Sequence, residues 1–318
     1  MRLKIILFII IFLSCVNSCS NNKGLKFPET REIKAELIKI NEIFNPNFLT
    51  MKGSYLLVAS AEANPMIYTY SLPSLTFLKA SVNKGRGPGE IPFFPMFCES
   101  PGSEMLYIWG YTPTSIGKNE IGVDGSLHFK EEILLGKYEE FNNMSIVDDS
   151  IFIYNNPTNL TVTKYDLKAE NQPEYISLEK ENHKEASFYS NNGYIVNNLT
   201  HLVYFYLYKK QLDFYDLNSF KLKRTIYWET NDPPIVIKDF TSLTYHYRNA
   251  YAGDNYLYAL YGSSRKGNLR LEVFDYRGNP IREYILDEMI TLFVIDEKKS
   301  ILYGFNSEDA EHFVRYYL

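Results

Sequence analysis

Cysteine is scarce in this sequence, and its distribution excludes a disulfide-stapled fold. Two of the three cysteines, Cys15 and Cys19, lie within the first 20 residues, so Cys98 is the one thiol in the rest of the chain. A single thiol cannot form an internal disulfide, and the fold must be held together by packing. Cys98 follows Pro95-Met-Phe, an apolar context that predicts a buried small hydrophobic residue rather than a nucleophile.

The sequence also lacks the residue spacings that mark common catalytic and metal sites. Its five histidines form no His-x-His or His-Glu-x-x-His motif, which gives a zinc site little support. It contains no Gly-x-Ser-x-Gly elbow and no calcium-binding loop of the helix–loop–helix type. Paired carboxylates such as Glu131-Glu132 are adjacent, and adjacent residues of a strand point to opposite faces. These motifs therefore predict no catalytic residue, no metal ligand and no cofactor.

Positive charge is limited and dispersed along the chain. Lysine and arginine number 33 against 38 aspartate and glutamate residues, for a formal net charge of −5. The longest basic clusters are pairs such as Lys209-Lys210. Nucleic-acid binding requires a concentrated basic surface, so we expect no nucleic-acid partner.

Long amphipathic helical patterns are missing too, and a short strand of aliphatic and aromatic residues recurs instead. It starts near residues 54, 104, 149, 201, 254 and 299, at intervals of 50, 45, 52, 53 and 45 residues. A repeat of this length is typical of a β-propeller blade or another stacked unit.

Three further strands complete each unit. The second strand ends in an aromatic–polar pair such as Tyr215-Asp216, and turn residues such as Asp124-Gly125 lead into a third strand. A less polar strand precedes the first one, starting near residues 47, 95, 142, 187, 243 and 291. Aromatic residues make up 16% of the chain, which suits a β-rich core. The pattern predicts an all-β, six-bladed propeller, with one or two β-sandwiches as the alternative.

The last unit ends at Leu318, just after its third strand, so its fourth strand has to come from elsewhere. Residues Glu32–Ile40 have the required length and alternation. We therefore expect this N-terminal strand to close the last blade, which removes the exposed edges of an open array.

The first 20 residues have the features of an export signal. A basic start, Met1–Lys4, precedes the apolar run Ile5–Leu13, which is too short to span a membrane. Val16-Asn-Ser-Cys19 resembles the lipobox of bacterial lipoproteins, which implies lipidation of Cys19. Cys15 as the lipidated residue and an ordinary cleaved leader are the alternatives.

This resemblance divides the chain into three parts. Residues 1–18 are expected to be the signal peptide, 19–30 the lipidated cysteine and its tether, and 31–318 the propeller. The expected location is the bacterial cell envelope, with a lipid anchor in the outer membrane and the domain facing the periplasm.

A glycine-rich segment, Lys84–Pro92, follows the third strand of the first unit. Gly85-Arg-Gly-Pro-Gly-Glu90 has the composition of a tight turn, and its backbone N–H groups could instead cradle an anion beside Arg86. Its spacing is not that of a nucleotide-binding loop. The motif, the leader and the repeat count together resemble the TolB-like and NHL-like six-bladed propeller lipoproteins of Bacteroidetes. The resemblance implies a propeller at the cell envelope and transfers no activity residue by residue.

The richest candidate site is Tyr245-His-Tyr-Arg-Asn249, in or just after the innermost strand of the fifth unit. Alternation places Tyr245 and Tyr247 on one face and His246 and Arg248 on the other. Arg248, His246 and Tyr245 could line the channel for an anionic or sugar-like ligand, with interblade packing as the alternative.

Two functions remain open at this point. The first is a non-catalytic binding or interaction module that is held at the membrane by its lipid and recognises a protein, peptide or glycan. The alternative is a calcium-dependent propeller hydrolase or lactonase, whose acidic and amide ligands would come from separate blades.

Overall fold

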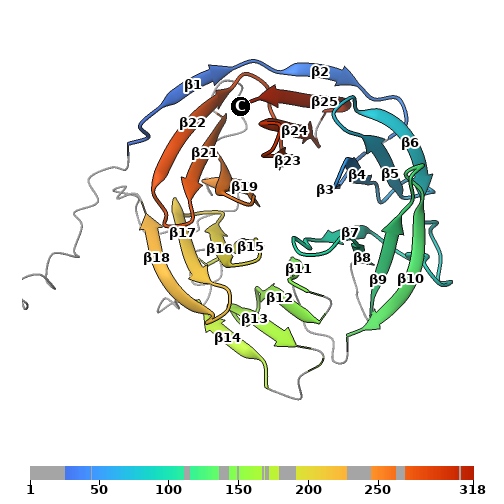
Figure 1. Ribbon diagram of the computed structural model, residues 1–318, viewed down its shortest axis with the longest axis horizontal. Helices are drawn as coiled ribbons and strands as arrows, with labels where there is room; N and C mark the ends of the chain where they lie inside the picture. Colours follow the sequence, from blue (N-terminus) through green and yellow to red (C-terminus); the bar gives the residue numbers. More distant parts are fainter. Residues whose placement is uncertain are drawn as a thin grey trace, which may run out of the picture.

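The computed structural model describes residues 26–318 apart from 44, 111–114, 136–142, 149, 167, 169–171, 179–190, 228–244, 263–268 and 308. Every regular element of the described part is a β-strand. The strands form six sheets that stand around a central axis as the blades of a propeller (Figure 1). No helix among the described residues is long and apolar enough to cross a membrane.

Each of the first four blades contains four antiparallel strands, in chain order from the axis outward. Blade 1 consists of β3 (Phe48–Lys52), β4 (Tyr55–Ala59), β5 (Ile67–Ser71) and β6 (Thr76–Ser81). Blade 2 consists of β7 (Pro95–Cys98), β8 (Leu106–Gly110), β9 (Ser115–Ile121) and β10 (Leu127–Leu134). Blade 3 consists of β11 (Met144–Ile146), β12 (Ile151–Asn156), β13 (Thr161–Asp166) and β14 (Glu174–Ser177). Blade 4 consists of β15 (Gly193–Asn197), β16 (His201–Tyr206), β17 (Gln211–Asp216) and β18 (Lys221–Tyr227).

The last two blades are each completed by a strand from the N-terminus. Blade 5 consists of β19 (Tyr247–Ala252), β20 (Tyr256–Tyr261), β21 (Leu269–Asp275) and β22 (Pro280–Leu286), with β1 (Thr30–Ile33) as a fifth strand. Blade 6 consists of β23 (Leu292–Asp296), β24 (Ile301–Asn306), β25 (Asp309–Tyr317) and β2 (Glu36–Lys39).

The core lies between neighbouring blades rather than inside any one of them. Leu212 and Phe214 of blade 4, for example, pack in one cluster with Leu257 and Phe274 of blade 5. The second strand of a blade therefore has a neighbour on both faces. This explains why β16 is apolar along nearly its whole length and buried from Leu202 onward, instead of alternating.

Strand β2 closes the ring, as the sequence predicted for residues 32–40. It pairs antiparallel with β25, so blade 6 combines the two ends of the described chain. Arg315 of β25 donates from Nε and Nη2 to the Glu36 carboxylate, at 3.0 and 2.6 Å. The same guanidinium donates to the Pro73 carbonyl oxygen of blade 1, so one side chain joins the last blade to the first.

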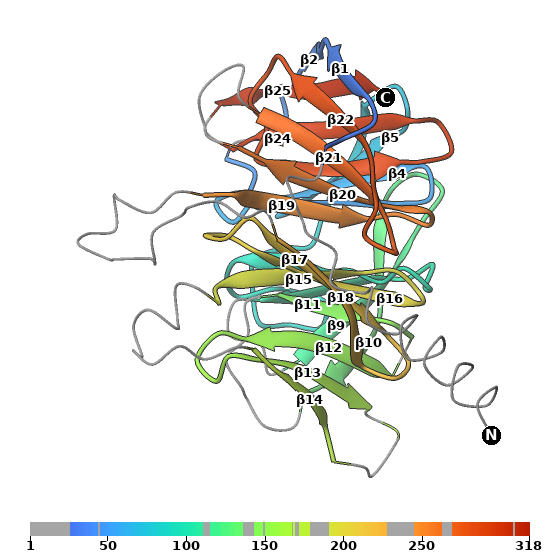
Figure 2. The ribbon, with the colours of Figure 1, turned by 90° about the vertical axis from the view of Figure 1, so that its left-hand side faces the viewer.

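The predicted closing strand is in fact two strands. Residues Thr30–Ile33 do not join blade 6 but pair in parallel with β22 on the outer edge of blade 5. Figures 1 and 2 show β1 and β2 following one another along the rim of the ring. The chain turns between them at Ala35, whose N–H donates to Asp287 Oδ1 at 2.9 Å. One straight strand cannot follow both blades because neighbouring blades are inclined to each other.

The six-bladed, all-β prediction is confirmed, but one innermost strand was placed wrongly. The structure begins that strand of blade 4 at Gly193, whereas the predicted one, at 187–190, lies outside the described residues. In blade 5 the strand begins at Tyr247, a few residues later than expected. Cys98 is fully buried, in the apolar surroundings that the sequence predicted for it.

Candidate binding site in the central channel

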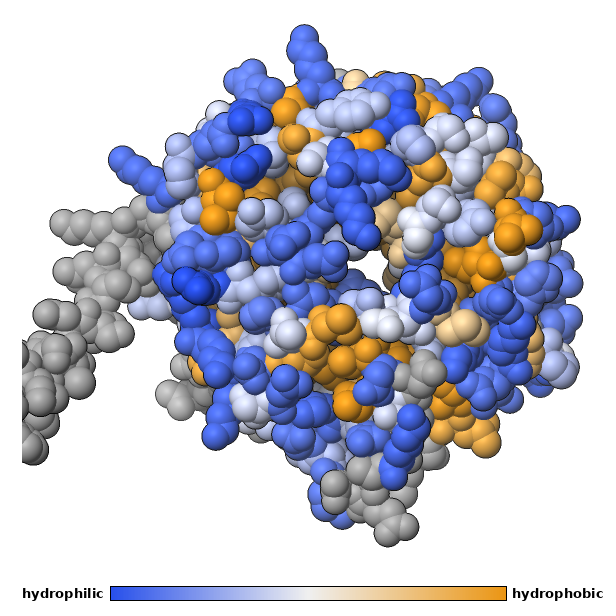
Figure 3. Space-filling model, viewed as in Figure 1, coloured by the Kyte–Doolittle hydropathy of each residue, from blue (hydrophilic) through white to orange (hydrophobic). Residues whose placement is uncertain are grey.

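The innermost strands of the blades enclose a cavity of about 410 Å³ on the propeller axis. Figure 3 shows the molecule hollowed at this centre. Much of the wall is apolar and aromatic, with contributions from Phe48, Met96, Trp109, Met144, Tyr194 and Phe293. A cavity of this size and character is in the range of small-molecule binding sites.

Three charged residues line the cavity: Lys52 of β3, Glu99 just after β7, and Arg248 of β19. The innermost strands all run in the same direction along the axis, because every blade has the same strand order. Lys52 and Glu99 lie where their strands end, whereas Arg248 lies where its strand begins. The cavity therefore has an arginine end and a lysine–glutamate end.

Arg248 occupies a β-bulge. The pairing of β19 with β20 shifts between Tyr247 and Asn249, which leaves Arg248 as the extra residue of the ladder. Its Nε donates to the Gly262 carbonyl oxygen at 2.9 Å, and its Cζ lies 5.3 Å from the centre of the Tyr245 ring. The guanidinium is thus oriented by a carbonyl and an aromatic face, as expected where a bulge re-aims a side chain.

The regular alternation predicted along Tyr245–Asn249 ends at the bulge, because the register of β19 shifts after Tyr247. Tyr247 is fully buried, whereas Tyr245 is 43% exposed and contacts Tyr208 through the two hydroxyl groups at 3.4 Å. The His246 ring stacks at 6.2 Å on Tyr261 and does not line the cavity. The structure therefore brings Arg248 to the cavity, keeps Tyr245 beside it, and places His246 elsewhere.

Arg86 is exposed in the loop between β6 and β7 and lies outside the cavity lining. The backbone of the glycine-rich loop around it binds the carboxylate of Glu90 in the same loop, since the Gly87 N–H donates to Glu90 Oε2 at 2.8 Å. A Cβ atom on Gly85 would stand 1.9 Å from that same oxygen, so a larger residue there would displace the Glu90 carboxylate from this position. This geometry fits the structural turn better than the ligand loop.

The other end of the cavity holds an amine inside the channel wall. Lys52 Nζ donates to the backbone carbonyl oxygens of Ser100 and Ser103, the latter at 2.9 Å. Burial lowers the pKa of Lys52 to about 8, although the nearby Glu104 and Glu99 carboxylates favour its charged form. The charge of Lys52 is therefore incomplete above neutral pH.

Glu99 faces this amine from blade 2. Its backbone carbonyl oxygen accepts from the Ile146 N–H at 2.7 Å, which fixes it to the innermost strand of blade 3. Burial raises the pKa of Glu99 to about 7, against the opposing effects of the Asn197 backbone and the Lys52 charge. Glu99 and Lys52 thus both titrate close to neutrality, and their charges largely offset each other between about pH 7 and 8.

Replacing Glu99 with Gln is expected to flatten the pH dependence of stability. The folded protein keeps a proton that the unfolded chain releases, so this contribution to stability is lost as the pH rises from about 4.5 through about 7. Relative to Glu99→Gln, the free energy of unfolding of the wild type should fall by about 1–3 kcal/mol over that window. Urea titrations at pH 5 and pH 7.5 measure it, and parallel profiles for the two proteins would contradict it.

Two asparagines of the cavity wall link neighbouring blades. Asn143 donates to the Ile195 carbonyl oxygen at 2.6 Å and accepts from the Ile195 N–H at 3.3 Å. Asn249 donates to the Thr291 carbonyl oxygen at 3.3 Å and accepts from the Ala250 N–H at 2.8 Å. Both amides therefore have a structural role between innermost strands.

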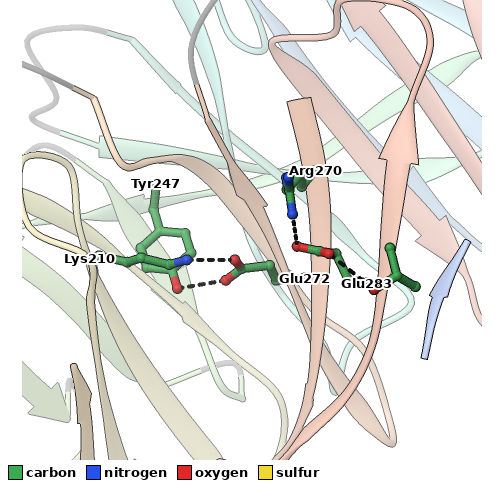
Figure 4. Close-up of polar contacts among 6 residues, drawn as sticks. Lys210, Tyr247, Arg270, Glu272 and Glu283 are labelled. Atoms are coloured by element: carbon green, nitrogen blue, oxygen red, sulfur yellow. Dashed lines mark hydrogen bonds and ion pairs between the residues drawn. The ribbon is translucent and has the colours of Figure 1, made fainter. Parts of the chain in front are cut away.

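A buried ion pair supports the start of β19 next to Arg248. Tyr247 donates its hydroxyl to Glu272 Oε2 at 2.9 Å, and Lys210 Nζ lies 3.0 Å from Glu272 Oε1 (Figure 4). Glu272 is completely buried, and burial raises its pKa despite the attraction of Lys210. Because Lys210 belongs to blade 4 and Glu272 to blade 5, the pair holds the two blades together.

A second ion pair lies beside the first on the next strand. Arg270 of β21 lies 2.8 Å from Glu283 of β22, and Glu283 also accepts from the Thr30 hydroxyl at 3.3 Å (Figure 4). Glu272 and Glu283 are directly opposite each other across the two strands. Each carboxylate has its own cation, which offsets the repulsion expected of facing like charges.

Sequence reasoning missed Lys52 and Glu99. Each is a charged residue at or just beyond the end of an otherwise largely apolar innermost strand, and this is the signal that could have found them. Asp296 shares the signal but caps a turn, where it accepts from the Lys299 N–H at 3.1 Å. The signal alone therefore does not distinguish a cavity residue from a turn residue.

Among the residues that the structure describes, no three histidine, cysteine, aspartate or glutamate side chains gather as a metal site. No protein of curated function shows significant sequence similarity to the chain.

Solved structures show the same architecture at low sequence identity. An exported protein of Bacteroides fragilis superposes with a TM-score of 0.58 at 10% identity, covering 91% of this chain and 98% of its own. The WD40 repeats of RRP9 give 0.53 at 11% identity, with 92% and 99% covered. A chain of the mitotic checkpoint complex gives 0.51 at 12% identity, with 93% and 89% covered. At such identities the similarity establishes the fold alone.

Six blades around a lined central cavity define the chain as a six-bladed β-propeller. The family model described as TolB-like 6-blade propeller-like matches residues 26–298. The protein belongs to this TolB-like family, as the resemblance of its repeats and glycine-rich loop had indicated.

Proposed function

We propose that the protein is an envelope lipoprotein whose propeller is a non-catalytic binding or interaction module, with its ligand in the central cavity. The cavity carries the proposal: it is about 410 Å³ in volume and lined by innermost strands of successive blades. Rigid strands hold the polar groups of this wall in fixed positions, which favours recognition. The expected partner is a peptide, protein or glycan of the envelope.

Anchoring at Cys19 is the second part of the proposal. Residues 1–25 lie outside the described part, so the lipobox-like sequence supports the anchor, together with the exported Bacteroides fragilis protein of the same fold. We place the domain on the periplasmic side of the outer membrane.

Fatty-acid labelling tests the anchor directly. The full chain, expressed in a bacterial host with labelled palmitate, is expected to incorporate the label and to fractionate with membranes. Cys19→Ala should lose both properties, whereas the matched variant Cys15→Ala should keep them. Label that persists in Cys19→Ala would overturn the assignment of Cys19.

The cavity is tested with an uncharged fluorescent probe, N-phenyl-1-naphthylamine. The wild type is expected to enhance its fluorescence with saturation, and Thr50→Phe, which adds bulk to the cavity wall, should abolish this at an unchanged melting temperature. Equal binding by both proteins would remove the cavity as the site. A melting temperature that rises with calcium and falls with chelator would instead favour the calcium-dependent hydrolase or lactonase.

A further inference from the structure

The bulge at Arg248 is a departure from the repeat. The innermost strands of the other five blades, all described in full, pair with their neighbours without a shift of register. A propeller needs the same packing from every blade, so a bulge in one innermost strand has no counterpart in the architecture. Bulges of this kind often direct a side chain at a functional site.

The charge of Arg248 is not neutralised by any carboxylate of the described residues. Its guanidinium contacts the Gly262 carbonyl oxygen and the Tyr245 ring, neither of which carries a negative charge. The remaining charges of the cavity, on Lys52 and Glu99, lie together at the opposite end. Among the described residues, the arginine end therefore carries a positive charge, and Arg248 has N–H donors beyond the single one bonded to Gly262.

The wall next to this charge is apolar. Tyr194 and Phe205 lie 5.7 Å apart between ring centres and both line the cavity, as do Phe48, Met96 and Trp109. Burial raises the pKa of Tyr194, so its phenol stays neutral at physiological pH. A half-buried cation beside aromatic faces suits a ligand that has a negative group and a hydrophobic body.

We infer that the cavity binds an organic anion, with the carboxylate, sulfonate or phosphate of the ligand on Arg248 and its aromatic or aliphatic body against Tyr194 and Phe205. This inference rests on the proposed binding function and specifies the chemical class of its ligand. The bulge places the Arg248 guanidinium at the cavity, and its contacts with Gly262 and Tyr245 orient it.

Two probes with the same aromatic skeleton test the inference. 1-Anilinonaphthalene-8-sulfonate carries the negative group, and N-phenyl-1-naphthylamine lacks it. For the wild type, we expect the sulfonate to bind about tenfold more tightly than the neutral amine, because a charge-assisted hydrogen bond is worth about that factor. The preference should shrink as salt is added.

The variant Arg248→Gln should remove this preference while leaving the affinity for the neutral probe unchanged. Lys209→Gln is the matched control, since Lys209 lies over the Tyr206 ring and does not line the cavity; it should keep the preference. An unchanged melting temperature of Arg248→Gln shows that the variant is folded, since dyes of this kind also bind partly unfolded chains.

The outcomes separate the two proposals. Equal affinities of the wild type for both probes, or a preference that survives in Arg248→Gln, would overturn the anion site and leave the binding function standing. Failure of both probes to bind the wild type would overturn the cavity as a ligand site altogether.

Discussion

Deleting residues 31–41 is expected to lower the melting temperature by about 10 °C or more, because it removes the outer strand of blade 6 and the fifth strand of blade 5 at once. The deletion breaks the link from Arg315 to Glu36 and opens the edge of β25 to solvent. Thermal unfolding followed by circular dichroism measures the effect. An unchanged melting temperature would contradict the role of these strands in closing the ring.

Two point substitutions in β2 distinguish the contribution of core packing to stability from that of strand pairing. Ile38 packs against the cluster between blades 6 and 1, whereas its neighbour Leu37 is 52% exposed. Ile38→Asp is expected to cost about 2–4 kcal/mol of unfolding free energy, because a carboxylate would be forced into an apolar contact. Leu37→Asp should stay within about 0.5 kcal/mol of the wild type.

Replacing Glu272 with Ala is expected to destabilise the protein by about 3–5 kcal/mol, since it removes the carboxylate that lies 3.0 Å from the largely buried Lys210 ammonium. The Tyr247 hydroxyl also loses its acceptor in a fully buried position. Both effects weaken the contact between blades 4 and 5. Urea-induced unfolding at neutral pH measures the loss.

A surface ion pair provides the matched control. Glu131 is 57% exposed in its pair with Lys118, so Glu131→Ala should change the stability by less than about 1 kcal/mol. The double variant Glu272→Leu with Lys210→Met should recover much of the loss, because an apolar pair can replace a buried ionic one. A double variant as unstable as Glu272→Ala would show that the charges themselves stabilise the interface.

The fold was largely predictable because every blade repeats the same local sequence pattern. Alternating strands and Asp-containing turns recur at a nearly constant spacing, and Asp216 indeed caps its turn by accepting from the Ser219 N–H at 2.8 Å. The split of the N-terminal segment into β1 and β2 could not be predicted from its alternation. It depends on the angle between blades 5 and 6, which no local pattern encodes.

The site was less predictable, for reasons that are equally physical. The sequence pointed to Arg248 but not to the bulge that directs it, because a register shift depends on the partner strand, β20. Lys52 and Glu99 approach each other only when blades 1 and 2 have packed side by side, because they belong to different strands of different blades. The distinctive Gly85–Glu90 motif proved to bind its own carboxylate, so a conspicuous motif is not always a ligand site.

The pairing of β2 with β25 also determines when the molecule can finish folding. Glu36 meets Arg315 across 279 positions of the chain, so the outer strand of blade 6 has no partner until β25 is available to pair with it. Contacts of such long sequence separation form slowly, and five blades without the sixth present open sheet edges. The newly made chain thus passes through an incomplete ring during which its N-terminal strands need protection from other chains.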